Sequence, residues 1–271
     1  MGSSNSKKCP VVAQVKYPIY CVKMLGFRHV LVAGGGGASK TGIPNKIEIF
    51  LLELENPEAD IEKPVRFVKV AQVETGLSVT SNLDVFRMND ATGEFLIACG
   101  QDQYCRLFST DYSVIHTQPP GSEGHKNGVR PGNPADQRAR ANAAVQRKLA
   151  FRLTEKTAFK TQFDGDDPYQ KTVRFDPKAG RFLATGGTDG YLRVYTTGQP
   201  PTKDARPALE IQAHKGEIDS LDLSLDGCFL ITCGREAKAH VWNAETGVKL
   251  TEIQPPPEVP ARYKIRMVKF T

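Results

Sequence analysis

Three stretches of the chain repeat one pattern of hydrophobic and polar positions. In each stretch an apolar run ends at a turn, and a run that alternates between apolar and polar residues follows. The stretches read FLIACGQDQYCRLF from Phe95, FLATGGTDGYLRVY from Phe182 and FLITCGREAKAHVW from Phe229. A glycine stands two positions before each of these phenylalanines, namely Gly93, Gly180 and Gly227. The pattern predicts two antiparallel strands joined by a hairpin in every copy, each entered through a glycine turn.

Further runs complete a four-stranded repeat around these hairpins. Short alternating runs at 172–175 and 220–223 are expected to be inner strands. Outer strands are expected at 208–212 and 249–253. Four strands per repeat, with a period near 40 to 45 residues, are typical of one architecture. The chain is therefore predicted to be all-β, a WD-repeat β-propeller.

His214 and Trp242 stand where such a repeat has its histidine and tryptophan. His214 precedes Trp242 by 28 residues. A catalytic histidine is the alternative, but in blades of this type the histidine normally closes a structural hydrogen-bond network. We expect that structural role for His214. Glu236 replaces the usual turn aspartate, which the other copies keep as Asp102 and Asp189.

The repeats predict how the chain is divided. A tail is expected at 1–16 and a partial propeller at 17–271, with a mobile basic insertion at about 118–150. The first strand of a fifth blade is expected at 264–270. Such a chain does not close a ring, so we expect a truncated form, or an open sheet edge covered by another chain. The four complete blades are expected at 17–75, 77–162, 167–212 and 214–256.

The charge of the chain is concentrated in the predicted insertion. The 36 Lys and Arg residues exceed the 30 Asp and Glu residues, which gives a net charge of +6. Between Gly121 and Arg152, seven basic residues stand against two acidic ones. The insertion has no aromatic residue to stack on bases, so a solvated loop is favoured over a nucleic-acid site.

The cysteines and the hydropathy of the chain exclude several classes of site. The six cysteines form no CxxC pair and have no neighbouring histidine at zinc-ligand spacing, so we expect reduced thiols packed in the core. No signal peptide is recognised at the amino terminus. No apolar run reaches the length that a membrane span needs, and no membrane span is predicted in this chain.

The chemically distinctive segment is GGGGASKTGIPNK, from Gly34 to Lys46. In one interpretation it is a P-loop, with Lys40 reaching a phosphate and Thr41 holding magnesium. Ser39 replaces the required glycine, and a strand is expected to follow where a P-loop needs a helix. In the other interpretation it is a hairpin loop. Four glycines are costly to order, so they are useful where a group approaches the backbone closely or carbonyls point inward.

Four stretches closely resemble the prolactin regulatory element-binding proteins, the exchange factors of the endoplasmic reticulum for the small GTPase that starts COPII coat assembly. The stretches are YPIYCVKML, LVAGGGGASKTGIPNK, ATGGTDGYLRVY and AHKGEIDSLDLSLDG. The resemblance extends from about Tyr17 to the end, apart from the insertion. It implies a seven-bladed propeller on the cytosolic face of the endoplasmic reticulum membrane, with one membrane span after the propeller. About three blades and that span are missing from this chain.

The resemblance also implies the site and its cofactor. The first-blade loop of the family binds a potassium ion and presses against the GTPase to expel GDP, without covalent chemistry. Here the ion would be held by the backbone from Gly34 to Asn45 and by the Asn45 side chain. A glycine-rich turn can point carbonyls at potassium, and the ordered loop would then dock at a smaller entropic cost. The loop residues expected to bind the GTPase are Gly34, Gly35, Gly36, Gly37, Thr41, Gly42, Ile43, Pro44, Asn45 and Lys46.

Within this loop Ile43 is expected to enter an apolar pocket, Pro44 to stiffen the turn, and Asn45 to hydrogen-bond the loop or the partner. The amino terminus, MGSSNSKK, fits the myristoylation pattern, which makes Gly2 a lipidation candidate beside a solvated tail as the alternative. Two other functions stay open. One is a scaffold without exchange activity, and the other is a nucleic-acid-binding regulator that acts through the basic insertion.

Overall fold

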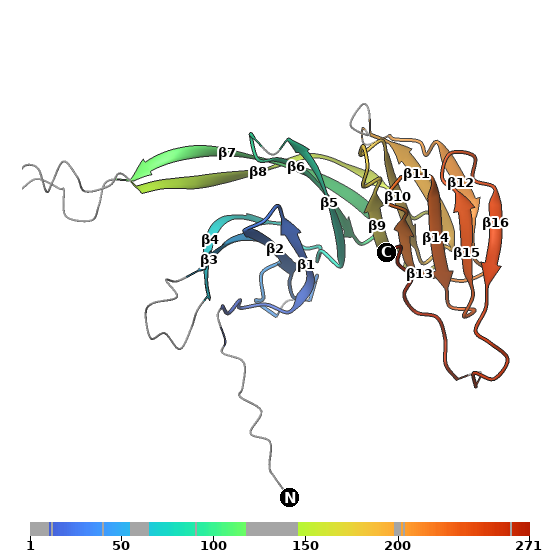
Figure 1. The fold of residues 1–271 in the computed structure, drawn as a ribbon. Helices are drawn as coiled ribbons and strands as arrows, with labels where there is room; N and C mark the ends of the chain where they lie inside the picture. Colours follow the sequence, from blue (N-terminus) through green and yellow to red (C-terminus); the bar gives the residue numbers. More distant parts are fainter. Residues whose placement is uncertain are drawn as a thin grey trace, which may run out of the picture.

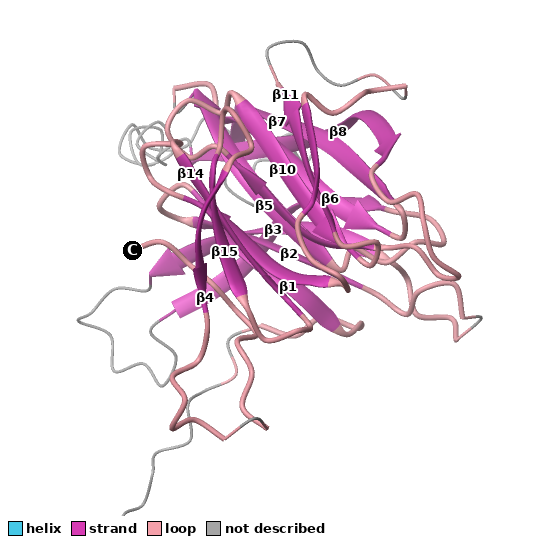
Figure 2. Ribbon diagram, turned by 90° about the vertical axis from the view of Figure 1, so that its right-hand side faces the viewer, coloured by secondary structure: helices cyan, strands magenta, loops and turns pink. Residues whose placement is uncertain are grey.

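The computed structural model describes residues 11, 13–39, 41–54, 65–89, 91–117, 146–197, 202, 204–260 and 262–271. Its described part consists of strands and loops, without a helix, and its sixteen strands form four antiparallel sheets of four strands each (Figures 1 and 2). The predicted all-β propeller with four blades is confirmed. We call the sheets blades 1 to 4 in chain order.

Blades 1 and 2 follow the predicted order from inner to outer strand. Blade 1 contains β1 (Ile19–Leu25), β2 (His29–Gly34), β3 (Lys46–Leu54) and β4 (Val65–Glu74). Blade 2 contains β5 (Asn82–Asn89), β6 (Glu94–Gln101), β7 (Tyr104–Thr117) and β8 (Gln146–Lys160). The β7–β8 hairpin projects well beyond the other strands of its blade (Figure 1). The strand β8 begins inside the predicted insertion of about 118–150, and residues 118–145 lie outside the described part.

Blades 3 and 4 have the same arrangement. Blade 3 contains β9 (Gln170–Phe175), β10 (Phe182–Gly187), β11 (Tyr191–Thr196) and β12 (Leu209–Gln212). Blade 4 contains β13 (Ile218–Leu223), β14 (Phe229–Gly234), β15 (Ala239–Asn243) and β16 (Lys249–Ile253). The inner strands β1, β5, β9 and β13 contact one another in succession, so the blades follow one another around a common axis.

The glycine turns before the repeated hairpins adopt the predicted conformation. Gly93, Gly180 and Gly227 have φ values of 63°, 61° and 72°, a left-handed region that favours glycine. Space is a second requirement at Gly93, because a Cβ there would lie 1.6 Å from the Tyr112 ring. These turns reverse the chain between the first and second strands of their blades.

The hydrophobic core lies between successive blades. Leu31 and Ile97 are fully buried in the cluster that joins blades 1 and 2, and Leu192 and Leu221 are fully buried in the cluster that joins blades 3 and 4. Of the cysteines that the structure describes, four are buried as predicted: Cys21, Cys99, Cys105 and Cys233. The prediction is wrong for Cys228, which is exposed because it lies in the turn between β13 and β14.

The predicted fifth-blade strand at 264–270 is not formed. The backbone N–H of Phe270 instead donates to Asp222 Oδ2 of β13, at 2.9 Å. The backbone N–H of Phe175 in β9 makes the same bond to Asp84 Oδ2 of β5, also at 2.9 Å. The segment therefore occupies the place of a next inner strand. Among the described residues no strand pairs with it through a backbone ladder, so it is not a strand, although β13 side chains bond its N–H groups.

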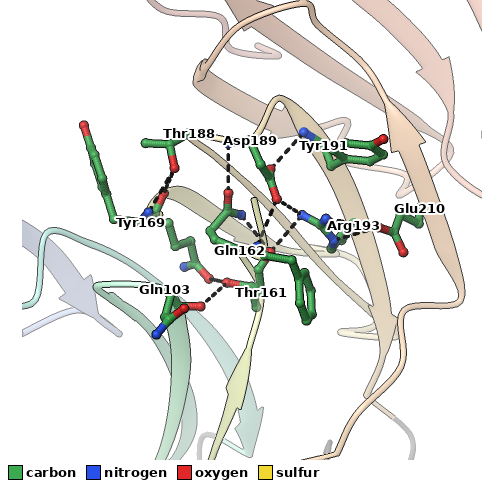
Figure 3. Close-up of polar contacts among 11 residues, drawn as sticks. Gln103, Thr161, Gln162, Tyr169, Thr188, Asp189, Tyr191, Arg193 and Glu210 are labelled. Carbon is green, nitrogen blue, oxygen red and sulfur yellow. Dashed lines mark hydrogen bonds and ion pairs between the residues drawn. The ribbon is translucent and has the colours of Figure 1, made fainter. Parts of the chain in front are cut away.

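Arg193 links blade 3 to the end of blade 2. Its side chain is 1% exposed, and its Nη1 donates to Asp189 Oδ2 at 2.6 Å and to the carbonyl of Thr161 at 2.9 Å (Figure 3). Its Nη2 donates to Glu210 Oε1 at 3.0 Å. Phe163 and Tyr191 lie against the guanidinium, with ring centroids 4.8 and 4.9 Å from its central carbon. Arg193 thus joins three segments of chain through one buried charge.

The structural role predicted for His214 is confirmed. Its Nε2 lies 2.8 Å from Thr232 Oγ1, which also accepts a hydrogen bond from Trp242 Nε1 at 3.0 Å. Its Nδ1 lies 2.6 Å from Glu236 Oε1, so glutamate replaces the usual aspartate without breaking the network. The His240 ring stacks on His214, with centroids 4.6 Å apart.

Acidification is expected to destabilise blade 4 through His214. Burial lowers the pKa of His214 below 6.5, against the opposing effect of Glu236, so the unfolded state binds the proton more readily. Stability should therefore fall as the pH drops through about 6.5, by at most about 1.4 kcal/mol per pH unit for one proton. Urea unfolding at pH 5 to 8 measures this. The His214→Gln variant should have a shallower pH dependence, and an unchanged slope would contradict the assignment.

Candidate functional site

The glycine-rich segment forms the loop between β2 and β3. Gly34 pairs with Lys46 in the β2–β3 ladder, so the loop is a hairpin connection between antiparallel strands. A strand follows it, which rules out the P-loop interpretation, because a phosphate-binding loop needs a helix at that point. Gly34, Gly35 and Asn45 are buried, whereas the stretch 41–44 is exposed. The loop therefore has a packed base and a solvent-exposed tip.

Close packing explains why the base of the loop is made of glycines. A Cβ at Gly34 would lie 1.9 Å from the carbonyl oxygen of Pro18. Gly35 has a φ of 151°, and a Cβ there would lie 2.0 Å from Asn45 Oδ1. A Cβ at Gly36 would lie 2.9 Å from the Cβ of Ile43. The first three glycines are thus required by neighbouring atoms.

Asn45 holds the base of the loop together. Its side-chain oxygen accepts a hydrogen bond from the backbone N–H of Gly37 at 2.9 Å. Its Nδ2 donates to the carbonyl of Gly37 at 3.1 Å and to the carbonyl of Gly76 at 2.9 Å. Gly76 belongs to the connection between β4 and β5. Asn45 is 4% exposed, and this one buried residue fixes the loop and the next connection to each other.

The remaining predicted residues lie at the tip or on β3. Thr41 Oγ1 bonds within the loop, accepting from the Ile43 N–H and donating to the Ser39 carbonyl, each at 3.4 Å. Gly42 has a φ of 74°, and Ile43 is 36% exposed. Pro44 is exposed. Lys46 is already part of β3, where its Nζ lies 3.3 Å from Glu74 Oε1.

The sequence prediction missed the connection between β4 and β5, which adjoins the loop. The predicted blades end at residue 75 and begin again at residue 77, and no functional role is predicted for this boundary. The backbone N–H of Thr75 donates to the Asn45 carbonyl at 3.0 Å, so this connection shares its anchor with the loop. The signal available was Leu77, an apolar residue between glycine and serine at a turn. That signal is weak, because single apolar surface residues are common.

The remaining sequence predictions concern metal binding, a membrane span and lipidation of the amino terminus. Among the described residues, no group of three or more His, Cys, Asp or Glu side chains is arranged to hold a metal ion. No helix in the described residues is long and apolar enough to cross a membrane. The lipidation candidate Gly2 lies outside the described residues, as does Lys40.

Comparison with known proteins identifies relatives of this loop-bearing propeller. Residues 205–243 match the family model described as WD domain, G-beta repeat. The guanine nucleotide-exchange factor SEC12 of Mus musculus is 31% identical over 237 residues, which cover 84% of this chain and 51% of the relative. SEC12 of Rattus norvegicus matches with the same identity and coverage. The chain spans about half the length of these curated relatives.

Solved structures support the same fold. The Sqt1 protein of Chaetomium thermophilum superimposes with a TM-score of 0.52 at 14% identity, covering 84% of this chain and 44% of that chain. At this identity the likeness concerns the fold alone. The sequence matches to SEC12 confirm the family resemblance predicted from the residues. The chain belongs to the WD-repeat family that contains the guanine nucleotide-exchange factor SEC12.

Proposed function

We propose that this chain promotes release of GDP from the small GTPase that starts COPII coat assembly, and that the β2–β3 loop is the surface that acts. The observation that carries the proposal is the Asn45 clamp: a buried side chain holds the base of a loop whose tip, with Ile43 and Pro44, faces solvent. A loop whose base is already ordered loses less conformational entropy on docking than a free loop would. Such a tip suits insertion into a partner.

Exchange follows from binding alone. A surface that binds the nucleotide-free GTPase more tightly than the GDP form must weaken GDP binding by the same factor. The proposed reaction uses no acid, base or nucleophile of this chain, so the protein acts without covalent chemistry. We place it at the cytosolic face of the endoplasmic reticulum membrane, as implied by the family, where a span after the propeller would tether longer members. Myristoylation of Gly2 stays a prediction.

The donor atoms at the base of the loop suit a potassium ion. The Gly37 and Gly76 carbonyls and Asn45 Oδ1 each take part in a side-chain hydrogen bond, and each oxygen keeps a second lone pair. All three are neutral oxygens, the donor type that binds potassium in backbone-lined sites. A bound ion would supply further cross-links at the base of the loop and stiffen it.

Added chain is expected to accelerate GDP release from its GTPase more in potassium than in sodium buffer at equal ionic strength. The measurement is the loss of fluorescence from a labelled GDP bound to the GTPase. A scaffold would bind without acceleration. A nucleic-acid binder would show salt-sensitive affinity for nucleic acid that disappears when 121–152 is deleted. Equal acceleration in both salts would refute the potassium role alone, whereas no acceleration in either would refute the exchange function.

A further inference from the structure

The connection between β4 and β5 presents an exposed leucine beside the loop. Leu77 is 77% exposed, while Thr75 and Thr80 on either side of it are buried. The β2–β3 loop follows the second strand of blade 1, and this connection follows the fourth. In an antiparallel sheet these two strands end on the same side, so the loop tip and Leu77 lie on one face of the propeller.

The first half of the connection is held by blades 1 and 2. The N–H of Thr75 donates to the Asn45 carbonyl, and its own carbonyl accepts from Arg106 Nη1 of β7 at 3.2 Å. The Gly76 carbonyl accepts from Asn45 Nδ2 at 2.9 Å. Gly76 has a φ of 73°, which turns the chain directly before Leu77. The position of the Leu77 backbone is therefore fixed from its amino-terminal side.

Hydrogen bonds also hold the second half of the connection between β4 and β5. Thr75 Oγ1 donates to the Ser78 carbonyl at 2.9 Å and closes the turn around Leu77. Ser78 Oγ donates to Asp102 Oδ2 at 2.7 Å. Thr80 Oγ1 accepts from Gln101 Nε2 at 2.8 Å. Side chains of this turn and of blade 2 thus fix the chain after Leu77 as well.

An apolar side chain held out on a rigid turn is what a docking surface requires. Its burial by a partner removes apolar area from water, while the backbone under it has already been ordered by folding. Asn45 Nδ2 bonds the carbonyls of both Gly37 and Gly76, so the loop that carries Ile43 and the turn that carries Leu77 are fastened to each other. The two apolar side chains belong to one pre-ordered unit.

We propose that Leu77 is a second apolar anchor for the same small GTPase, and that Asn45 is the positioning residue that fixes this anchor relative to Ile43. This inference rests on the proposed exchange function and extends its contact surface from blade 1 to the junction with blade 2. The partner surface must offer two apolar sites, one for the loop tip and one for Leu77. An exposed leucine that a partner covers contributes to affinity roughly in proportion to the apolar area removed from water.

The test compares Leu77→Asp with Phe27→Asp. Phe27, 89% exposed in the turn between β1 and β2, lies at the opposite end of blade 1 and is the matched control. Binding to the nucleotide-free GTPase and the rate of GDP release are both measured. Leu77→Asp should weaken binding and slow release by about 10-fold to 100-fold, with an unchanged melting temperature. Phe27→Asp should match the unaltered chain, and Leu77→Met should retain most of the activity.

The outcomes separate the two proposals. If the unaltered chain accelerates release and Leu77→Asp does so equally, the anchor is refuted and the exchange function stands. If the unaltered chain binds the GTPase without accelerating release, the exchange function is refuted, and the binding comparison still decides whether Leu77 is an anchor. If the unaltered chain neither binds nor accelerates release, both are refuted. An equal loss of binding and GDP release in Phe27→Asp would also refute the anchor, because the loss would then not depend on the propeller face that carries the substitution.

Discussion

Replacement of Asn45 by alanine is expected to reduce the acceleration of GDP release by about 10-fold to 100-fold. The variant removes three side-chain hydrogen bonds and leaves the carbonyls of Gly37 and Gly76 without this donor. The loop must then be ordered at the moment of docking, which costs affinity. Because Asn45 is buried, the free energy of unfolding should also fall, by about 1 to 3 kcal/mol. GDP release and urea unfolding measure the two effects.

Two further variants separate the clamp from general stability. Asn45→Asp keeps the size of the side chain and an acceptor for the Gly37 N–H, but it cannot donate to either carbonyl, so it should also lose exchange. Asn89→Ala removes an exposed asparagine whose Oδ1 accepts from the Ala91 N–H in the turn after β5, and it should leave exchange unchanged. Full exchange activity in Asn45→Ala, at a temperature where it is folded, would show that the clamp does not matter for function.

Replacement of Arg193 by methionine is expected to lower the free energy of unfolding by about 3 to 5 kcal/mol. The reason is Asp189, whose side chain is fully buried and faces the Arg193 guanidinium at 2.6 Å. Without Arg193 that carboxylate would be a buried charge with its cationic partner removed, and the Thr161 carbonyl would lose a donor. Urea unfolding followed by circular dichroism measures the loss.

A second substitution tests whether the buried Asp189 carboxylate, left without Arg193, causes the loss of stability. Arg193→Met combined with Asp189→Asn should recover part of the lost stability, because the amide carries no charge. Arg152→Met is the matched control. Arg152 is paired with Asp111 at 2.9 Å but its side chain is 75% exposed, so solvent screens the pair and its loss should leave the free energy of unfolding nearly unchanged. Equal losses in Arg193→Met and Arg152→Met would contradict the burial argument.

The blades could be predicted because their signals are local and repeated. The copies that begin at Phe95, Phe182 and Phe229 each show a glycine turn, an apolar run and an alternating run, and these become the second and third strands of blades 2, 3 and 4. Side-chain alternation along a strand decides which face is buried, so the core between blades follows from the same pattern. The segment 264–270 does not form the predicted strand, because a strand also needs a partner strand, and the residues of the segment do not reveal whether one is present.

The sequence by itself determined the four-stranded repeats, the structural role of His214 and the location of the glycine-rich loop between two strands. Only the tertiary structure decided how that loop is held. Asn45 meets Gly76 because β3 pairs with β4 at this end of blade 1. Arg106 meets the Thr75 carbonyl because blade 1 packs on blade 2. It also showed that the exposed Leu77 lies on a turn fixed by both blades. Periodicity records which face of a strand is buried, whereas contacts between connections depend on how the sheets are placed, and this is set by packing across the whole chain.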